Sequence, residues 1–546
     1  MAVLESGLDA GSSTFKKNKV DTCDVLGKID EALEEAFLGG GEKAIQSLRK
    51  KGKLTLRERV QMLLDNDSPF LEIAPLAGWR SNYTVGSGAV AGIGIVNGVE
   101  CVIFGNDPSV KAGMVNDFNI RKLDRALQIA TENRLPYISL TESSGADLNG
   151  LHGAYDTEPE DALRRDMNHF QGMGRSFYSI VNLSKMGIPT IAVIFGPTAA
   201  AGTYQPAMCD YTICVKDQTH VYLASPPFLK VVTGEVTDPE SLGGAEMHTK
   251  VSGFGDYLAK NEMDAIRLCR GIVDHINWEK QGPGPTKPIA EPKYDSEELL
   301  GLVSKDLKSP FDMREVVARV VDGSEFEEFK ANYDTNLICG WASIHGFPVG
   351  IIGNNGPLFP KGASKGSQFI QLCNLHNTPI IFLHNVPGMM VGTEYEQEGM
   401  IKEGAKMLNA VSCSTVPHIS IVCGGSFGAG TFAMSSPKFD TRFTFMWPLA
   451  KTGFVGARIM AGTMYMLRQA TAARRGEKLD PVKEMEMMQN AEYCEEERSA
   501  ALFAASRVHN DGVIDPRDTR MVLAMTLSAC HNGPIKGTKE FGTWRM

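Results

Sequence analysis

The same segment occurs twice in this chain. GIPTIAVIFGPTAAAGTYQP at Gly187–Pro206 aligns without gaps with TVPHISIVCGGSFGAGTFAM at Thr415–Met434. The separation between matched positions is constant, so that Gly202 and Gly430, for example, lie 228 residues apart. Unrelated segments do not match over this length without gaps. The chain is therefore predicted to contain two copies of one structural unit.

A predicted β-hairpin precedes each copy of the repeated segment. Gly92–Asp107 and Gly340–Asn355 both alternate apolar residues around a turn glycine. A helix that leads through a Pro-containing turn into an apolar strand also recurs, with strands at Arg134–Leu140 and Asn377–Leu383. This order is typical of parallel α/β structure.

The length also requires more than one domain, because 546 residues exceed what a single hydrophobic core serves. A Pro/Gly-rich stretch at Lys280–Glu298 has the composition of a linker. We predict an α/β protein of two tandem domains, at residues 20–278 and 290–540. A helical stretch from about Gly456 to Val508 lies outside the repeat, and its methionines have the spacing of core packing.

Charge and cysteine content argue against several classes of protein. The formal net charge is −10, and Lys and Arg are scattered, so we expect neither a nucleic-acid surface nor a membrane surface. No apolar run reaches the roughly 18 residues of a membrane span, and the first residues resemble neither a secretory signal nor a transit peptide. Eleven cysteines without metal-ligand spacing predict neither a disulfide framework nor a metal site. We expect a cytoplasmic protein.

Each repeated segment predicts a strand, a turn crowded with Gly and Ala, and a helix: FGPTAAAGTY and CGGSFGAGTF. Small residues let a ligand approach the backbone, and the first amides of a helix have no intrahelical partner. Such amides suit a developing oxyanion, such as the enolate of a thioester. The alternative is that the small residues only permit close packing of helix and strand. Two matched copies favour the anion site.

Side-chain catalysis has little support in the sequence. The chain contains no GxSxG elbow, HExxH helix or Walker-type phosphate loop. Ser426 and Thr431 suit helix caps as well as nucleophiles. Backbone amides are therefore the better candidates for the catalytic groups.

Several longer stretches resemble one known family. They are Gly52–Gly78, Thr141–Asp147 (TESSGAD), Ala224–Gly244, Asn385–Leu408 and Asp511–Arg520. From Gly52 to Met546 the chain resembles the carboxyltransferase β subunits of biotin-dependent acyl-CoA carboxylases, within the crotonase-like (ClpP/crotonase) superfamily. The stretch EYEQEGMIKEGAKM and the ending WRM resemble the 3-methylcrotonyl-CoA and geranyl-CoA carboxylases in particular.

The resemblance implies two crotonase-like domains that transfer a carboxyl group from carboxybiotin to an acyl-CoA through an enolate. Acyl-CoA would lie on the N-terminal domain and biotin on the C-terminal domain, at an active site formed where these domains of two subunits face each other. The oxyanion holes would be the backbone amides of Ala201 and Gly202, and of Ala429 and Gly430. No metal is implied in this chain.

Further contacts follow from the same resemblance. For acyl-CoA they are Ser144, Gly145, Ala146 and Thr203, and for biotin they are Gly428, Thr431 and Phe432. Two features depart from the family pattern. Relatives usually carry Gly where this chain has Ala201, which narrows the acyl pocket or shifts the turn. The stretch Gly150–Phe170 also differs.

The chain lacks a Met-Lys-Met biotinylation site and a Gly-rich nucleotide loop. Biotin is therefore expected on a partner α subunit that supplies the biotin carboxylase and biotin carrier functions. The family implies self-association, at least a dimer and a β hexamer by analogy. We expect four basic residues of the N-terminal half, Lys111, Arg121, Lys122 and Arg134, to be surface charges rather than CoA ligands.

Four alternatives remain open. One is the β subunit of a propionyl- or acetyl-CoA carboxylase, and another is a biotin-dependent decarboxylase or transcarboxylase subunit. A third is an enoyl-CoA hydratase-type enzyme, which requires carboxylates near the oxyanion hole. The last is a CoA-binding scaffold without activity.

Overall fold

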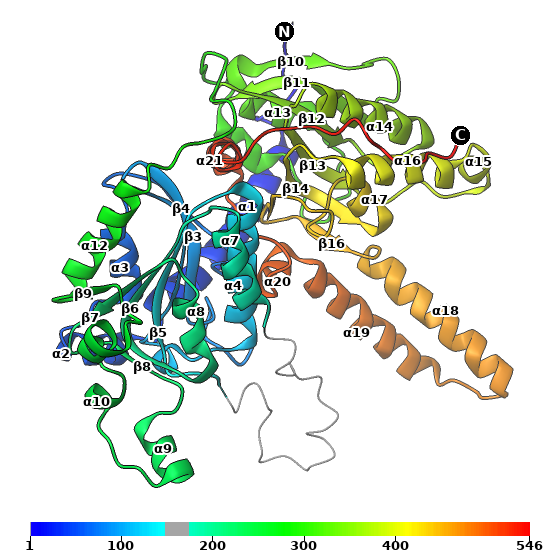
Figure 1. The fold of residues 1–546 in the computed structure, drawn as a ribbon. Coiled ribbons are helices and arrows are strands. Elements are labelled where there is room, and N and C mark those ends of the chain that lie inside the picture. The colour runs from blue at the N-terminus through cyan, green and yellow to red at the C-terminus, as the bar shows by residue number, and fades with distance from the viewer. Residues whose placement is uncertain (1, 148–173) are drawn as a thin grey trace. The chain divides into compact units, whose positions relative to one another are not determined.

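The computed structural model describes residues 2–147 and 174–546 (Figure 1). The stretch Gly150–Phe170, expected to differ from relatives, lies outside the described residues. Chain contacts separate two compact units. The N unit comprises Asp30–Lys280 with Ser506–Val508, and the C unit comprises Met1–Ile29, Gln281–Ala505 and His509–Met546.

The N unit is built on an eight-stranded sheet, counted over the described residues, with the order β2-β3-β4-β5-β6-β7-β9 and with β8 paired to β6. Its strands are β2 (Phe70–Glu72), β3 (Ala89–Val96), β4 (Val99–Asn106), β5 (Tyr137–Ser143), β6 (Thr190–Ala199), β7 (Tyr211–Val215), β8 (His220–Tyr222) and β9 (Tyr257–Ala259). The β2–β3 and β3–β4 pairs are antiparallel and the others parallel.

The C unit has a nine-stranded sheet over the described part of the chain, with the order β1-β10-β11-β12-β13-β14-β15-β17 and with β16 paired to β14. Its strands are β1 (Ala2–Val3), β10 (Glu325–Glu328), β11 (Leu337–Ile344), β12 (Phe347–Asn354), β13 (Ile380–Val386), β14 (His418–Phe427), β15 (Phe443–Met446), β16 (Lys451–Gly453) and β17 (Gly512–Val513). The predicted α/β class is confirmed.

From β2 and from β10 onward, the two sheets repeat one topology. Antiparallel pairing of the first strands changes to parallel pairing at β4–β5 in the N unit and at β12–β13 in the C unit. Even an irregularity recurs, since the register shifts between Thr141 and Ser143 in one sheet and between His384 and Val386 in the other. The predicted strand–turn–helix order is thus present in both units.

The two predicted hairpins also share their turn. Asn97–Gly98 and His345–Gly346 both have positive φ, at 46° and 76° and at 46° and 77°. Two successive residues with positive φ are characteristic of the two-residue turns that match strand twist. One carboxylate accepts both turn N–H groups in each unit, Asp65 in the first and Asp322 in the second. Both hairpins are therefore fixed by the same device.

Helices cover both faces of each sheet (Figure 1). In the N unit, α3 (Leu56–Leu63) and α12 (Glu262–His275) cover one face, and α4 (Asp117–Asn133) and α7 (Arg175–Lys185) cover the other. The buried layer beneath α3 and α12 includes Ile103, Ile138 and Val193. The shorter helices are α2 (Glu42–Lys50), α8 (Tyr204–Ala207), α9 (Pro226–Thr233), α10 (Pro239–Gly243) and α11 (Ala245–Met247).

In the C unit, α14 (Pro360–Leu375) and α16 (Met400–Cys413) pack together on one face, and α13 (Met313–Val320) and α21 (Thr519–Cys530) lie on the other. The shorter α15 (Thr393–Gln397) and α17 (Gly428–Ala433) follow β13 and β14. Two helices, α1 (Ser13–Leu38) and α20 (Ala501–Ser506), contain residues of both units.

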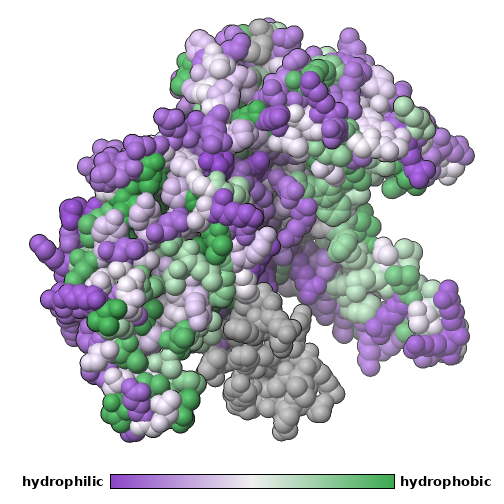
Figure 2. Space-filling model, in the orientation of Figure 1, coloured by the Kyte–Doolittle hydropathy of each residue, from purple (hydrophilic) through white to green (hydrophobic). Residues whose placement is uncertain are grey.

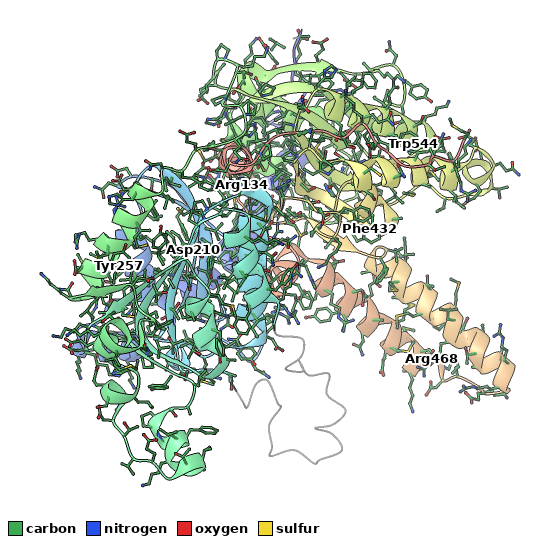
Figure 3. All side chains as sticks on the ribbon, in the orientation of Figure 1. Arg134, Asp210, Tyr257, Phe432, Arg468 and Trp544 are labelled. Atoms are coloured by element: carbon green, nitrogen blue, oxygen red, sulfur yellow. The ribbon has the colours of Figure 1, made fainter. Side chains whose placement is uncertain are left out.

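An arm of two helices, α18 (Ala457–Arg475) and α19 (Pro481–Ser499), projects from the rest of the C unit (Figure 1). Arg468, labelled in Figure 3, forms an ion pair of 2.9 Å with Glu484 across the two helices. Many apolar side chains of the arm are exposed, among them Met466 and Leu467 (Figure 2). The prediction that these methionines pack in a core is therefore wrong for much of the arm.

Three further observations concern the described residues. No helix there combines the length and hydropathy needed to cross a bilayer. No group of three or more His, Cys, Asp or Glu in that part of the chain is arranged to hold a metal ion. All eleven cysteines are free thiols.

Candidate functional site

The turns at the carboxyl ends of β6 and β14 have the same backbone conformation. Ala200 follows β6 with a φ of 56°, and Gly428 follows β14 with a φ of 57°. Glycine adopts this left-handed conformation without steric cost, whereas a Cβ atom adds strain of about 1–2 kcal/mol. The N unit therefore maintains the turn geometry of the C unit despite an alanine at the strained position.

A short helix begins at each turn and is not capped. The N-cap residues are Ala199 and Phe427, and neither makes a side-chain capping bond. The first three N–H groups of each helix have no intrahelical partner. These groups belong to Ala200, Ala201 and Gly202 in the N unit, and to Gly428, Ala429 and Gly430 in the C unit. Both predicted pairs of amide donors thus belong to the first turn of a helix, where backbone N–H groups carry partial positive charge.

The loop that follows the neighbouring strand lies beside each turn. Ser143, the last residue of β5, pairs with Thr198 near the end of β6, so Ser144, Gly145 and Ala146 leave the same edge of the sheet as the β6 turn. Ala146 forms an isolated parallel bridge with Val115. The structure therefore brings the predicted Ser144–Ala146 loop and the Ala201–Gly202 amides to one edge.

The equivalent loop of the C unit follows β13. Met389 bridges to Leu358 in the same parallel sense, and Leu358 donates its N–H to the carbonyl of Gly388 at 3.0 Å. Gly388 also packs on the β14 turn, because a Cβ atom at Gly430 would lie 3.2 Å from its backbone and 2.8 Å from Val386 Cγ2. A Cβ atom at Gly202 would meet no described atom within 4 Å. The β14 turn is therefore the more tightly packed of the two.

The matched threonines differ in their hydrogen bonds. Thr203 is buried, and its hydroxyl donates to the Ala200 carbonyl at 2.7 Å. Thr431 is partly exposed, and its hydroxyl oxygen accepts from Ser426 Oγ at 3.0 Å. Ser426 is in turn 3.0 Å from Nδ1 of His384. Sequence reasoning did not identify His384, because its partner lies on the next strand.

Phe432 is the largest side chain among the predicted biotin contacts. This residue, labelled in Figure 3, is 45% exposed. Its ring stacks on that of Phe439, with the ring centroids 5.6 Å apart. A half-exposed ring held by a second ring presents a fixed apolar face. This face lies on α17, the helix that begins at the β14 turn.

A buried ion network lies behind the β6 turn. Glu142 on β5 pairs with Lys53 and, at 2.9 Å, with Arg59, whose guanidinium also pairs with Glu262 at 2.8 Å. A Cβ atom at Gly196 would collide with the Glu142 carboxylate. Both oxygens of Glu142 are thus engaged by cations. Sequence reasoning missed this network.

The same position in the C unit is neutral. Asn385 on β13 corresponds to Glu142, and its Oδ1 accepts from the Gly425 N–H at 3.2 Å. One turn is therefore supported by ion pairs and the other by uncharged hydrogen bonds.

The expected surface charges have mixed outcomes. Lys111 is exposed and pairs with Asp147 at 3.3 Å, and the Arg134 guanidinium lies over the Trp278 ring. The guanidinium of Arg121 lies over the Phe118 ring. The expectation is wrong for Lys122, whose side chain is fully buried.

Lys122 lies inside the N unit because its ammonium group has a partner there. It donates to the Ala89 carbonyl at 2.7 Å, and burial lowers its pKa to about 8. Lys365 holds the equivalent place on α14 and donates to the Asp334 carbonyl at 3.1 Å. Lys122 thus connects α4 to β3, and Lys365 connects α14 to the loop before β11.

Several known proteins are similar to this chain. Residues 47–543 match the family described as the carboxyl transferase domain. The chain is 48% identical over 545 residues to a probable biotin-dependent acyl-coenzyme A carboxylase beta2 subunit of Mycobacterium tuberculosis, with 100% of both chains covered. It is 42% identical over 549 residues to a mitochondrial methylcrotonoyl-CoA carboxylase beta chain of Dictyostelium discoideum, covering 100% of this chain and 91% of the relative.

Among solved structures, the beta subunit of Pseudomonas aeruginosa geranyl-CoA carboxylase matches with a TM-score of 0.88 and 38% identity. The match covers 100% of both chains.

Proposed function

Since the chain belongs to the carboxyl transferase family, as the carboxyltransferase subunit of a biotin-dependent acyl-CoA carboxylase, we propose how its two turns divide the reaction. The β6 turn holds the acyl-CoA thioester, and the β14 turn holds the ureido group of biotin. The observation that carries this proposal is the pair of matched, uncapped turns in the two units.

Each unit is, in this proposal, one crotonase-like domain, and the two arose by duplication. The repeated topology, the shared register shift and the common hairpin device support a duplication. The proposed domain boundaries are residues 20–278 for the acyl-CoA side and 290–540 for the biotin side.

On the acyl-CoA side, the amides of Ala201 and Gly202 donate to the thioester oxygen. Transfer of a proton from the α carbon, or from the γ carbon of an enoyl substrate, to the ureido group of biotin would place negative charge on that oxygen. Amides fixed by the fold stabilise this charge without reorganisation. The Ser144–Ala146 loop would lie along the thioester, and Thr203 would hold the turn in shape through its bond to Ala200.

On the biotin side, the residues present suit a ureido group. The amides of Ala429 and Gly430 are uncapped, Ala429 is exposed, and Phe432 offers an apolar face for the fused rings. Carboxybiotin, when bound, supplies the carboxyl group. The amides would hold the ureido oxygen, and Gly428 and Thr431 would complete the turn that surrounds it.

The hydratase-type alternative requires a carboxylate free to act as a base beside the oxyanion site. Asp147 directly follows the Ser144–Ala146 loop and pairs with Lys111 at 3.3 Å. Glu142, two residues before the loop, has its two oxygens engaged by Lys53 and Arg59. This arrangement favours carboxyl transfer over hydration. The scaffold alternative predicts no transfer with any acyl-CoA.

For the acyl group, we propose 3-methylcrotonyl-CoA or another branched or longer enoyl- or acyl-CoA. The relatives named for methylcrotonoyl-CoA and geranyl-CoA support this choice. A methyl group at Ala201 would narrow the acyl pocket. Propionyl- or acetyl-CoA carboxylation, and decarboxylation or transcarboxylation by the same half-reaction, are the alternatives.

We further propose that a partner α subunit carries biotin and the biotin carboxylase. The β subunits would form at least a dimer, and a hexamer by family analogy, with the N unit of one subunit facing the C unit of another. A cytoplasmic location accords with the eleven free thiols, since disulfides are rare in reducing compartments.

The proposal is tested by assaying the subunit, with its native biotin-bearing partner, against acyl-CoAs from acetyl- to geranyl-CoA. We expect the highest kcat/KM for a branched or longer enoyl-CoA, and no ATP-coupled carboxylation by this subunit alone. Preference for acetyl- or propionyl-CoA would contradict the proposed acyl group. Absence of transfer to every acyl-CoA would contradict the function.

A further inference from the structure

Three side chains of the C unit form a hydrogen-bonded row that ends at the β14 turn. His384 on β13 is 1% exposed and Ser426 on β14 is fully buried. Nδ1 of His384 is 3.0 Å from Ser426 Oγ, which donates to Thr431 Oγ1 at 3.0 Å. Thr431 lies one residue after Gly430, inside the first turns of α17. The row therefore connects a buried imidazole to the edge of the proposed biotin site.

The direction of these bonds follows from counting protons. Ser426 has one hydroxyl proton and donates it to Thr431, so it must accept from His384, whose Nδ1 carries hydrogen. Burial lowers the pKa of His384 to about 3, a hydrogen bond with the Met434 backbone opposes this shift, and the ring is neutral.

The hydroxyl proton of Thr431 is left for a ligand. Its oxygen already accepts from Ser426, and no described residue accepts a hydrogen bond from it. Thr431 is partly exposed and directly follows Ala429 and Gly430 in α17, the helix that has no side-chain cap. Hydrogen bonds in a chain polarise one another, so a donor at the end of such a row is strengthened.

The N unit has no such row. The positions that match the three residues are Thr141, Thr198 and Thr203. Thr141 bonds to Ser139, and Thr198 Oγ1 has no described partner. Thr203 donates its proton to its own turn. A third donor therefore exists at only one of the two turns, over the residues that the structure describes.

We propose that His384, through Ser426, positions the Thr431 hydroxyl as a third hydrogen-bond donor to the ureido oxygen of biotin, beside the amides of Ala429 and Gly430. The inference rests on the proposed function, which places biotin at this turn. His384 is a positioning residue, because it acts through Thr431 and transfers no proton.

The test uses the whole subunit and free biotin with an isotope-labelled ureido carbonyl. Binding is measured by titration, and the carbonyl stretch of bound biotin by difference infrared spectroscopy. A lost hydrogen bond weakens binding about five- to tenfold. Thr431→Val, which keeps the side-chain shape, should show this loss and a carbonyl stretch shifted back toward that of free biotin. Thr431→Ser should retain both properties.

His384 is tested by two variants. His384→Leu should reproduce the Thr431→Val effects, whereas His384→Asn, which retains a donor near the Nδ1 position, should restore them. In the double variant His384→Leu with Thr431→Val, the first change should add no further loss, because the row acts through the threonine. If the losses in binding from the two changes were additive, His384 would not act through Thr431, and the proposal would be contradicted.

A buried histidine of the same sheet provides the control. Both ring nitrogens of His418 have serine partners, Ser435 at 2.9 Å and Ser414 at 2.8 Å, away from the turn. His418→Asn should leave the bound carbonyl stretch unchanged, and a shift there would contradict a specific role for His384.

The two proposals fail in different ways. If Thr431→Val left the carbonyl stretch of bound biotin and the affinity for biotin unchanged, the third donor would be contradicted. The proposed function would not be affected by that result. If the unaltered subunit bound no biotin and transferred no carboxyl group, the proposed function itself would be wrong.

Discussion

The β6 and β14 turns share a backbone but differ in their surroundings. Gly202 faces open space among the described residues, whereas Gly430 packs on Val386 and Gly388. Ion pairs of Glu142 support the β6 turn, and uncharged side chains support the β14 turn. In the proposed function, the shared backbone geometry provides the anion site, and the neighbouring side chains adapt each turn to its own ligand.

The largest expected effect is on catalysis at the open turn. Gly202→Val adds a bulky side chain at the place where the thioester oxygen would bind. The added Cβ atom would have no described atom within 4 Å. Because a lost oxyanion donor costs about 10²–10³ in rate, we expect carboxyl transfer to fall by that factor. Carboxylation assays and urea unfolding of the same preparation measure this, and the unfolding midpoint should not change.

The matched change in the C unit is not equivalent. Gly430→Val would collide with Val386 and with the Gly388 backbone, so it tests packing together with chemistry. Gly271→Val is the better control, since its Cβ atom also meets no described atom. Normal turnover in Gly202→Val would contradict the assignment of this turn.

The second prediction concerns the supports behind the turns. Glu142→Leu leaves Lys53 with the Phe195 carbonyl and the buried Arg59 with Glu262, and breaking a buried pair costs about 3–5 kcal/mol. Asn385→Leu removes uncharged bonds at the equivalent position and should cost about 1–3 kcal/mol. Urea unfolding measures the free energy of unfolding of both variants. Equal losses would show that the ion pairs of Glu142 stabilise the fold no more than the hydrogen bond of Asn385 does.

Part of this picture could be predicted from the sequence. The ungapped repeat located both turns, and the glycine of each hairpin located its turn correctly. These features are local, so residue type and spacing were sufficient. The sequence drew attention to Ala201, but the strained φ belongs to its neighbour Ala200. Composition alone does not reveal which alanine of a run has the left-handed conformation.

Other features depend on contacts between distant residues. Its residue type predicts that Lys122 is a surface charge. In the structure, its ammonium group is buried because the Ala89 carbonyl accepts a hydrogen bond from it. Glu142 and His384 acquire their roles from Arg59 and Ser426, which lie on other elements. The exposed methionines of the arm have core-like spacing, yet no described element covers them. Periodicity does not identify such partners.

A smaller effect is expected at the hairpins. Burial works to raise the pKa of Asp65, but hydrogen bonds from Asn97–Gly98 and the Arg270 guanidinium lower it below its usual value. A carboxylate with a lowered pKa stabilises the fold above its unfolded pKa of about 3.9, and this stability is lost as pH falls through the folded pKa. Asp65→Asn should therefore cost about 1 kcal/mol at neutral pH and less in acid.

Unfolding free energies measured from neutral to acidic pH check this prediction. Asp322→Asn is the matched change, since Asp322 accepts the same pair of turn amides and pairs with Arg520 at 2.8 Å. A loss for Asp65→Asn that did not shrink in acid would show that its charge is not involved.

The smallest expected effect is that of a change at Ala200, the left-handed position of the β6 turn. Ala200→Gly removes the Cβ strain and should stabilise the fold by about 0.5–1 kcal/mol, after the entropic cost of glycine. Gly428→Ala should destabilise it by about 1–2 kcal/mol, because its Cβ atom would also lie 3.1 Å from the Phe454 carbonyl oxygen. Thermal unfolding distinguishes these opposite signs, and a destabilised Ala200→Gly variant would argue against strain.

The most direct test of the division between the turns is the thioester carbonyl stretch of bound acyl-CoA, measured by difference infrared spectroscopy with an isotope-labelled thioester. We predict a downshift in the unaltered subunit that is lost in Gly202→Val and retained in Thr431→Val. A downshift that survives in Gly202→Val, or that disappears in Thr431→Val, would contradict the placement of acyl-CoA at the β6 turn.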